Sequence, residues 1–311
     1  MKAFKNASVY AEGKGIIRTS VYFDDKIRQI GGYVAGAEEI ELPENAVVLP
    51  GFIDEHIHGA GGSDAMDGNT KDLAIIAETV AKEGTTSFLA TTMTQSKENI
   101  LKAMRAVKEY REAAGEQGAR IAGVHLEGPF IAAAHKGAQP LEYVAAPDAK
   151  TFDEYNAACG NAIKIITLAP ETDGALDFIR HIVAQGTVVS IGHTGAKYAE
   201  VKAAMEAGAT NVTHTYNAQS PLHHREIGVV GSALLLEDLY CELICDTIHV
   251  SVPAMQLLVK NKRADKLALI TDAMRAKGLA DGVSELDIVF VLLALIGMIA
   301  ALVWDKMRPG M

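Results

Sequence analysis

Cysteine is scarce in this chain. Cys159, Cys241 and Cys245 are the three cysteines among 311 residues, and no pair has the C-x-x-C spacing. So odd and sparse a set excludes a disulfide framework and is typical of proteins in the reducing cytoplasm. We therefore expect a cytoplasmic protein in which the cysteines pack as small apolar side chains. The stretch from Met1 to Asn6 lacks the apolar core of a signal peptide, so we expect no export.

Basic residues are also in deficit. The chain has 29 Lys and Arg against 39 Asp and Glu, which gives a formal net charge of -10 and leaves no basic block. This balance excludes nucleic acid and an anionic membrane surface as general partners. An anionic substrate would therefore need a local positive pocket. Because 49% of the residues are hydrophobic, the chain can bury a large core, and its length suits one main barrel domain.

From Val47 onward, apolar strand-like runs alternate with amphipathic helical patterns. Eight such runs are present: Val47–Ile53, Thr85–Ala90, Ile121–Leu126, Ile163–Leu168, Thr187–Ile191, Asn211–Thr213, Tyr240–Cys245 and Leu267–Ile270. Strands that alternate with helices predict parallel pairing, and eight such units close into a (β/α)8 TIM-type barrel, an α/β fold. A doubly wound open sheet is the alternative. The barrel is favoured because polar residues follow nearly every run, and a barrel brings those strand ends to one mouth.

Local signals mark the ends of several predicted elements. Ser96 stands where it can cap a helix, and Thr151 with Glu154 three residues on has the spacing of a capping box. Over residues 1–47, short apolar runs alternate with glycines and an Asp-Asp turn, which predicts a few antiparallel strands. We therefore expect a small β module over 1–47 and a barrel over 48–283.

A metal site is first suggested by the stretch from Pro50 to Gly59, which contains His56 and His58. It follows an apolar run, so it is expected to be the end of a strand entering a glycine-rich loop. Side chains two apart on a strand share a face, so both imidazoles can reach one metal ion. A single His-x-His does not make a full ligand set, however.

Other residues that can bind metal follow the later runs. They are Glu127, His193, His214, His249 and Asp272. Because matching strand ends converge in a barrel, we expect these side chains to form a metal centre. Histidines with a carboxylate suit Zn or Fe, and a position left open for water is what hydrolysis requires.

The two carboxylates are expected to have different roles. Glu127 is the carboxylate expected on the metal, whereas Asp272, after the last strand, is expected to be the base that accepts a proton from water. His125 precedes Glu127 by two residues, and a supporting or packing role is expected for it.

Several motifs together resemble one family. HLEGPF (125–130), GHT (192–194), THTYNA (213–218), DTIHV (246–250) and ITDAM (270–274) closely resemble N-acetylglucosamine-6-phosphate deacetylase, of the amidohydrolase superfamily. The resemblance runs from residue 1 to about Val283. It implies a (β/α)8 barrel beside a small β-sandwich, a homodimer, and hydrolysis of the acetamido group to glucosamine 6-phosphate and acetate.

The resemblance also implies the roles of site residues. The principal metal would be held by Glu127, His193 and His214, and a second metal by His56 and His58. Asp272 matches the catalytic acid/base. The sugar phosphate would be held by Asn217, Ala218, Arg225 and His249, some of them across the dimer interface, and Ala138 would contact the sugar.

Two further observations bear on these assignments. Gln139 stands where some family members have a histidine. His223, His224 and Arg225 form the densest positive cluster near a strand end, as a phosphate dianion requires in so acidic a protein.

The resemblance stops after Val283. Residues 284–311 contain an apolar run from Ile288 to Trp304, which is at the lower limit for a membrane span. A helix packed over the barrel is the other interpretation of this run. Any contact with a membrane is therefore expected through this tail alone.

Two other functions fit parts of the pattern. A cyclic amidohydrolase such as a dihydroorotase commonly has a modified lysine at the end of the fourth strand. Here that end is Leu168-Ala169-Pro170, and Lys164 lies at the start of the run. The other alternative is a truncated, inactive relative that still binds metal or sugar phosphate, which the unusual tail favours.

Overall fold

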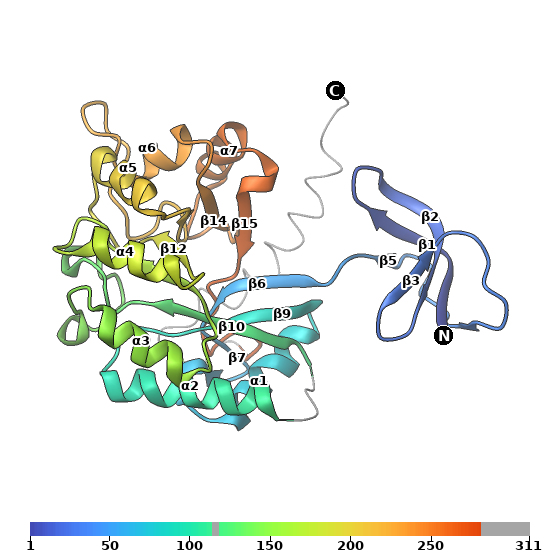
Figure 1. Cartoon of the computed structure of the whole chain (residues 1–311). Coiled ribbons are helices and arrows are strands. Elements are labelled where there is room, and N and C mark those ends of the chain that lie inside the picture. The colour runs from blue at the N-terminus through green and yellow to red at the C-terminus, as the bar shows by residue number, and fades with distance from the viewer. Residues whose placement is uncertain (114–117, 281–311) are drawn as a thin grey trace. The chain divides into compact units, whose positions relative to one another are not determined.

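The computed structural model describes residues 1–113 and 118–280. The predictions about the 284–311 tail, including the run from 288 to 304, lie outside these residues. The chain divides into two compact units, Met1–Phe52 and the residues from Ile53 onward (Figure 1). Over the described residues, no helix combines the length and the apolar character needed to cross a bilayer.

The first unit is a small β-sheet. Its strands are β1 (Lys2–Ala11), β2 (Gly15–Phe23), β3 (Ile27–Ile30), β4 (Glu38–Glu39) and β5 (Val47–Val48). The pairs β1–β2 and β2–β3 are antiparallel, as predicted. The prediction of antiparallel strands is wrong for β4 and β5, which both run parallel to β1. β4 pairs with the start of the long β1, and β5 pairs with its end.

The second unit contains an eight-stranded sheet within the described residues. The strands are β6 (Phe52–Ile57), β9 (Thr85–Thr91), β10 (Arg120–Glu127), β11 (Ile163–Leu168), β12 (Val188–Ile191), β13 (Asn211–Val212), β14 (Tyr240–Ile244) and β15 (Leu267–Ile270). They run parallel and pair in chain order, and a bridge from Ile57 to Ala273 nearly closes the barrel. The predicted (β/α)8 barrel is confirmed. A short antiparallel pair, β7 (Gly59–Ala60) and β8 (Ser63–Asp64), follows β6.

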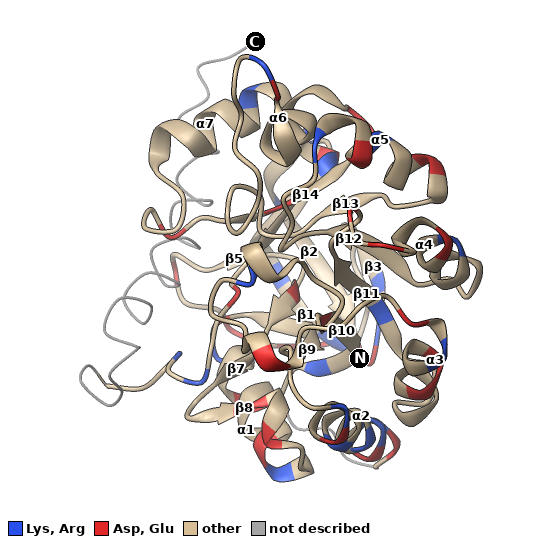
Figure 2. Ribbon diagram, turned by 90° about the vertical axis from the view of Figure 1, so that its left-hand side faces the viewer, with Lys and Arg blue, Asp and Glu red and all other residues tan. Residues whose placement is uncertain are grey.

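Helices surround the barrel strands (Figure 2). They are α1 (Thr70–Ala81), α2 (Lys97–Glu112), α3 (Ala149–Ala158), α4 (Ala175–Ala184), α5 (Tyr198–Ala207), α6 (Gly228–Leu235) and α7 (Val252–Asn261). Short 3-10 turns lie at Ala65–Asp67, Ala133–His135, Leu141–Tyr143 and Ala264–Lys266. In α2, Ile100, Met104 and Val107 are buried against the sheet, whereas charged residues colour much of its ribbon in Figure 2. This apolar stripe explains why α2 packs on the barrel.

Capping side chains set where two of these helices begin. Ser96 caps α2 as predicted, because its hydroxyl accepts from the Asn99 backbone N–H at 3.3 Å. The capping box predicted at Thr151 and Glu154 is wrong. Asp148 caps α3 instead, and its carboxylate accepts from the backbone N–H groups of Lys150 and Thr151. A short carboxylate before the first turn satisfies these exposed donors, so the helix begins earlier than Thr151.

The first barrel strand also differs from the prediction. The apolar run Val47–Ile53 is split, since Val47–Val48 pairs with β1 and the barrel strand is Phe52–Ile57. Pro50 lies at the break and has no backbone N–H to donate to a strand ladder. As a result, His56 lies within a barrel strand rather than in a loop, and its side chain is fully buried.

Candidate metal centre

The first cluster joins three strand ends. Glu127 is the last residue of β10, and His193 and His214 each lie two residues beyond a strand. Glu127 Oε1 lies 3.1 Å from Nε2 of each histidine, and the two nitrogens are 3.2 Å apart. Ligands about 2.0 to 2.1 Å from a tetrahedral metal are roughly 3.3 Å from one another. The three atoms therefore fit one face of such a coordination shell.

The proton positions support this fit. His193 Nδ1 lies 2.9 Å from the His135 backbone carbonyl, which can only accept. Nδ1 must therefore carry the proton, which leaves the Nε2 lone pair directed into the cluster. His214 Nε2 faces this lone pair at 3.2 Å, so a proton or a cation has to lie between the two nitrogens.

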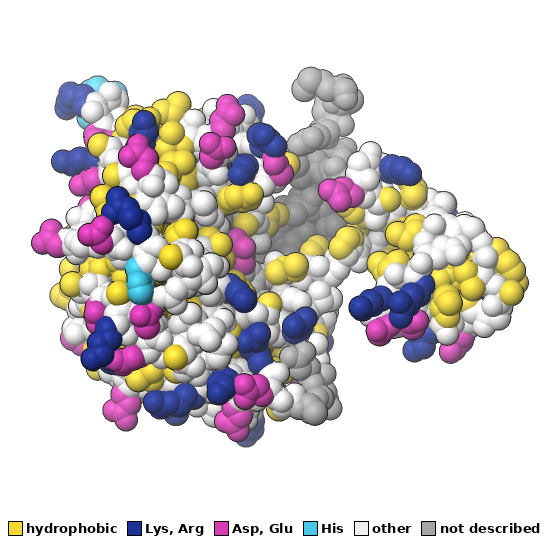
Figure 3. Space-filling view, in the orientation of Figure 1, with side chains coloured by type: hydrophobic (Ala, Val, Ile, Leu, Met, Phe, Trp, Pro, Cys, Tyr) yellow, Lys and Arg dark blue, Asp and Glu magenta, His cyan; other side chains and the backbone are white. Residues whose placement is uncertain are grey.

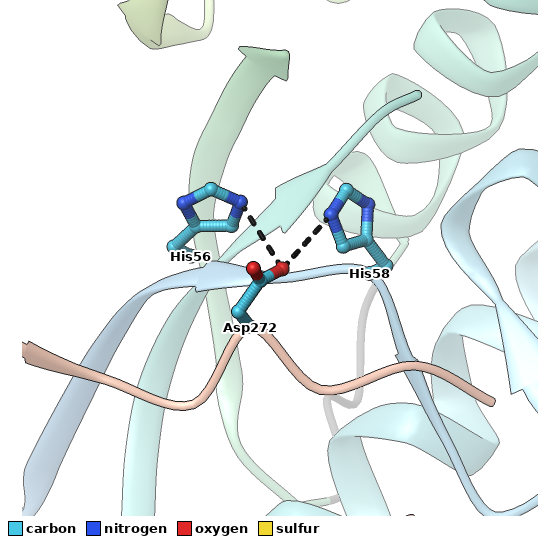
Figure 4. A group of neighbouring side chains, drawn as sticks. All are labelled: His56, His58 and Asp272. Carbon is cyan, nitrogen blue, oxygen red and sulfur yellow. Dashed lines mark ion pairs between the residues drawn. The ribbon is translucent and has the colours of Figure 1, made fainter. Parts of the chain in front are cut away.

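The second cluster consists of His56, His58 and Asp272, whose side chains converge in Figure 4. Asp272 Oδ1 lies 3.4 Å from His56 Nε2 and 3.2 Å from His58 Nε2. The backbone holds these elements together, because Asp272 N–H donates to the His56 carbonyl at 2.9 Å and His58 N–H donates to the Ala273 carbonyl at 2.8 Å. The backbone contacts that close the barrel therefore also hold the residues of the second cluster together.

Glu127 lies between the two clusters. Its Oε1 is 3.4 Å from His56 Nε2, and its Oε2 is 3.3 Å from His58 Nε2. A carboxylate that faces histidines of both groups can bridge two metal ions. The residues present therefore fit either one ion or two.

The backbone at three of these positions is unusual. His193 has φ of 48°, His214 has φ of 28° and Asp272 has φ of 48°. Such values lie in the left-handed region, which residues other than glycine rarely adopt. Strained conformations of this kind cluster at functional sites, where the surrounding structure maintains them.

The electrostatics show that the clusters favour positive charge. Burial opposes charging of His58, yet its hydrogen bonds to Asp272 and Glu127 raise its pKa to about 10. Burial would raise the pKa of Asp272, but the neighbouring His56 and His58 lower it to about 2. Without a metal ion, protons on the histidines thus compensate the buried carboxylates.

Three buried supporting residues had no role predicted from the sequence. Gln139 Nε2 donates to Glu127 Oε2 at 2.7 Å, and Gln139 Oε1 accepts from the Thr94 N–H at 2.6 Å. Asp54 accepts from the Thr271 hydroxyl at 2.6 Å and so ties β6 to the segment after β15. Glu242 lies 2.9 Å from His56. The sequence could have identified Glu242 as a supporting residue, because it is an acid inside an otherwise apolar strand. It could have identified Asp54 in the same way, because Asp54 and His56 are two apart on one strand and share a face.

His125 has the surroundings expected of a supporting residue. Its ring is buried, with Nδ1 3.0 Å from the Glu55 carbonyl and Nε2 2.7 Å from the Thr167 hydroxyl. Burial, reinforced by the nearby His56, lowers the pKa of His125 to about 4, so the ring is neutral.

Some of the predicted substrate residues lie beside the first cluster. Asn217 and Ala218 follow His214 within one turn of the chain, and the Ala218 carbonyl accepts from the Thr194 N–H at 3.0 Å. A methyl group added to Gly137 would lie 3.4 Å from His193 Cε1 and 4.0 Å from Ala218 Cβ. The loop that carries the exposed Ala138 therefore borders the cluster.

The other two predicted substrate residues lie on separate loops. Arg225 is exposed on a turn in which His223 pairs with Glu226, and its Nη1 is 2.9 Å from His224 Nε2. His249 is half-buried and forms a close ion pair with the Asp246 carboxylate. The contacts of the described residues do not join Arg225 to either cluster.

A parallel barrel with two groups of histidines and carboxylates at its strand ends is the arrangement of metal-dependent barrel hydrolases. Residues 47–292 match the sequence profile of the amidohydrolase family, and the chain belongs to this family. Its similarity to individual proteins is more specific. The N-acetylglucosamine-6-phosphate deacetylase of Bacillus subtilis (strain 168) is 46% identical over 80% of this chain. That of Lysinibacillus sphaericus is 42% identical over 85% of this chain and 68% of the relative.

A solved structure supports the same relationship. It is a mutant N-acetyl-D-glucosamine-6-phosphate deacetylase from Mycobacterium smegmatis in complex with N-acetyl-D-glucosamine-6-phosphate. It matches with a TM-score of 0.81 and 29% identity over 92% of this chain and 74% of that chain. The resemblance predicted from the motifs is thus confirmed. The chain spans 63% of the length of the Bacillus subtilis relative.

Proposed function

We propose that this protein hydrolyses the acetamido group of N-acetyl-D-glucosamine 6-phosphate to D-glucosamine 6-phosphate and acetate, a step of amino-sugar catabolism. The observation that carries the proposal is the triangle of Glu127, His193 and His214 beside the second cluster. The names of the relatives support the substrate.

The proposed cofactor is Zn or Fe, as one or two ions per subunit. Glu127, His193 and His214 would hold the principal ion, and His56 with His58 would hold a second ion next to the Glu127 carboxylate. A divalent ion held there would lower the pKa of a coordinated water and polarise the amide carbonyl.

Asp272 is the proposed acid/base. Its carboxylate is ionised at neutral pH, since the flanking histidines lower its pKa to about 2. It can therefore accept a proton at Oδ1 from the attacking water and return it to the nitrogen of the leaving amine.

The remaining proposed roles concern the substrate and the assembly. Asn217, Ala218, Arg225 and His249 would hold the sugar phosphate, and Ala138 would contact the sugar. Arg225 is exposed on its turn, which suits a residue acting across the interface of a homodimer. We also propose a cytoplasmic location, a catalytic domain over 48–283 and a separate small β module over 1–47.

A substrate panel tests this function. Metal-loaded protein should release acetate from N-acetylglucosamine 6-phosphate, and far more slowly from unphosphorylated N-acetylglucosamine. Arg225→Ala should raise KM for the phosphorylated sugar and leave the slow reaction of the unphosphorylated sugar unchanged. Equal rates with and without the phosphate would contradict the proposed substrate, and turnover of dihydroorotate instead would favour the cyclic amide alternative.

A further inference from the structure

Glu242 is a buried acid that links the two clusters. It lies in the middle of β14, and its side chain is almost fully enclosed. Its Oε2 is 2.9 Å from His56 Nδ1 and accepts from the His214 backbone N–H at 3.0 Å. One carboxylate oxygen is thereby bonded to a residue of each cluster.

We propose that Glu242 is a positioning residue that fixes the tautomer of His56 and holds the His214 backbone in place. The inference rests on the metal centre of the proposed function. A carboxylate beside Nδ1 keeps the proton on that nitrogen, so Nε2 is left as the metal ligand. His56 Nε2 is the atom that faces Glu127 Oε1 and Asp272 Oδ1, each at 3.4 Å.

A third metal site is the competing interpretation of this region, because His56, His125 and Glu242 lie close together. The hydrogen bonds of His125 exclude it. His125 Nδ1, which is 3.9 Å from Glu242 Oε1, also lies 3.0 Å from the Glu55 carbonyl and must carry a proton to donate there. A protonated nitrogen cannot bind a metal ion. The carboxylate of Glu242 therefore accepts hydrogen bonds from His56 and His214 and does not bind a third ion.

The two oxygens of Glu242 suggest a sharp test. Oε2 makes both bonds, whereas Oε1 has no hydrogen-bond partner among the described residues. In Glu242→Gln the amide oxygen can occupy the Oε2 position and keep both bonds. Glu242→Leu has a similar volume and loses both.

The experiment is a titration of the full chain with Zn²⁺ against a competing chelator, together with metal content. Glu242→Leu should weaken binding of the second ion about 10- to 100-fold, the usual effect of removing a partner of a metal-binding histidine. The first ion should be affected less, because at His214 the bond is to the backbone. Glu242→Gln should bind both ions nearly as the wild type does.

Cys241→Ala is the matched control, since Cys241 is a fully buried neighbour on β14 whose side chain points to the opposite face. Glu242→Leu with wild-type affinity for both ions, or no weaker than Cys241→Ala, would overturn the inference. So would nitrogen NMR of the zinc-loaded wild type showing His56 bound through Nδ1, a result that needs no variant to fold. A wild type that binds no zinc would instead refute the metal centre itself.

Discussion

Glu127 is the residue on which both clusters depend. Its two oxygens lie within 3.4 Å of nitrogens of His193, His214, His56 and His58. Gln139 fixes its orientation from the side. A carboxylate buried among four histidines is costly unless positive charge compensates it, which is why the same site that fits metal ions also retains protons without them.

We therefore predict that Glu127→Gln loses the principal ion and lowers kcat/KM by more than about 100-fold, beyond the usual effect of removing only a supporting partner. Metal content and acetate release measured on the same sample test this. Glu83→Gln is the control, because Glu83 pairs with Lys277 at 2.7 Å and has no part in the clusters. Full metal content in Glu127→Gln would show that Glu127 is not a ligand.

Metal affinity should rise with pH. The pKa of His58 is raised to about 10 in the metal-free protein, so the ion has to displace protons throughout the neutral range. Each displaced proton makes the affinity about tenfold higher per pH unit. Competition titrations between pH 6 and pH 8 measure this slope. An affinity that is independent of pH would mean that His58 does not bind the ion.

At the scale of elements, the start of α3 distinguishes between two capping assignments, the Asp148 cap of the structure and the capping box of Thr151 and Glu154 predicted from the sequence. Asp148→Ala should lower the free energy of unfolding by about 1 kcal/mol, because it removes the acceptor of two backbone N–H groups. Glu154→Ala, which would break the capping box predicted from the sequence, should change it by less than about 0.5 kcal/mol. Urea unfolding of both variants tests the assignment. A larger loss of stability in Glu154→Ala than in Asp148→Ala would support the capping box instead.

The strand β3 lies at an edge of the sheet in the small unit. All four of its residues are exposed, with Ile27 at 65% and Ile30 at 56%, and apolar side chains gather on the surface of this unit in Figure 3. β3 pairs with β2, which leaves its other edge open within the described residues. Exposed apolar edges of this kind promote association between chains.

We predict that Ile27→Lys reduces concentration-dependent self-association, as measured by light scattering. Gln29→Lys adds the same charge on the same strand without removing an apolar side chain, and it should have a smaller effect. Wild-type protein that stays monodisperse at high concentration would show that the edge of β3 does not mediate self-association.

At the scale of the whole molecule, the sequence predicted the structural features that depend on local pattern. Alternating strands and helices predicted the barrel, and residues at the strand ends predicted a metal centre, since a parallel barrel brings those ends together. The division of these residues into a principal and a second metal site came from the family resemblance. The break at Pro50 was missed because the surrounding run is uniformly apolar. Glu242 was missed because it lies inside a strand and bonds to His56, which is 186 positions away in the chain.

Acetate release from N-acetylglucosamine 6-phosphate by the full chain, with metal content determined on the same sample, tests the proposed activity most directly. We predict that the wild type contains Zn or Fe and releases acetate. Asp272→Asn should keep the principal ion but lose at least about 100-fold in kcat, because its amide cannot accept the proton. Metal-loaded wild type that releases no acetate would contradict the proposed function, and an active Asp272→Asn would contradict the role of Asp272.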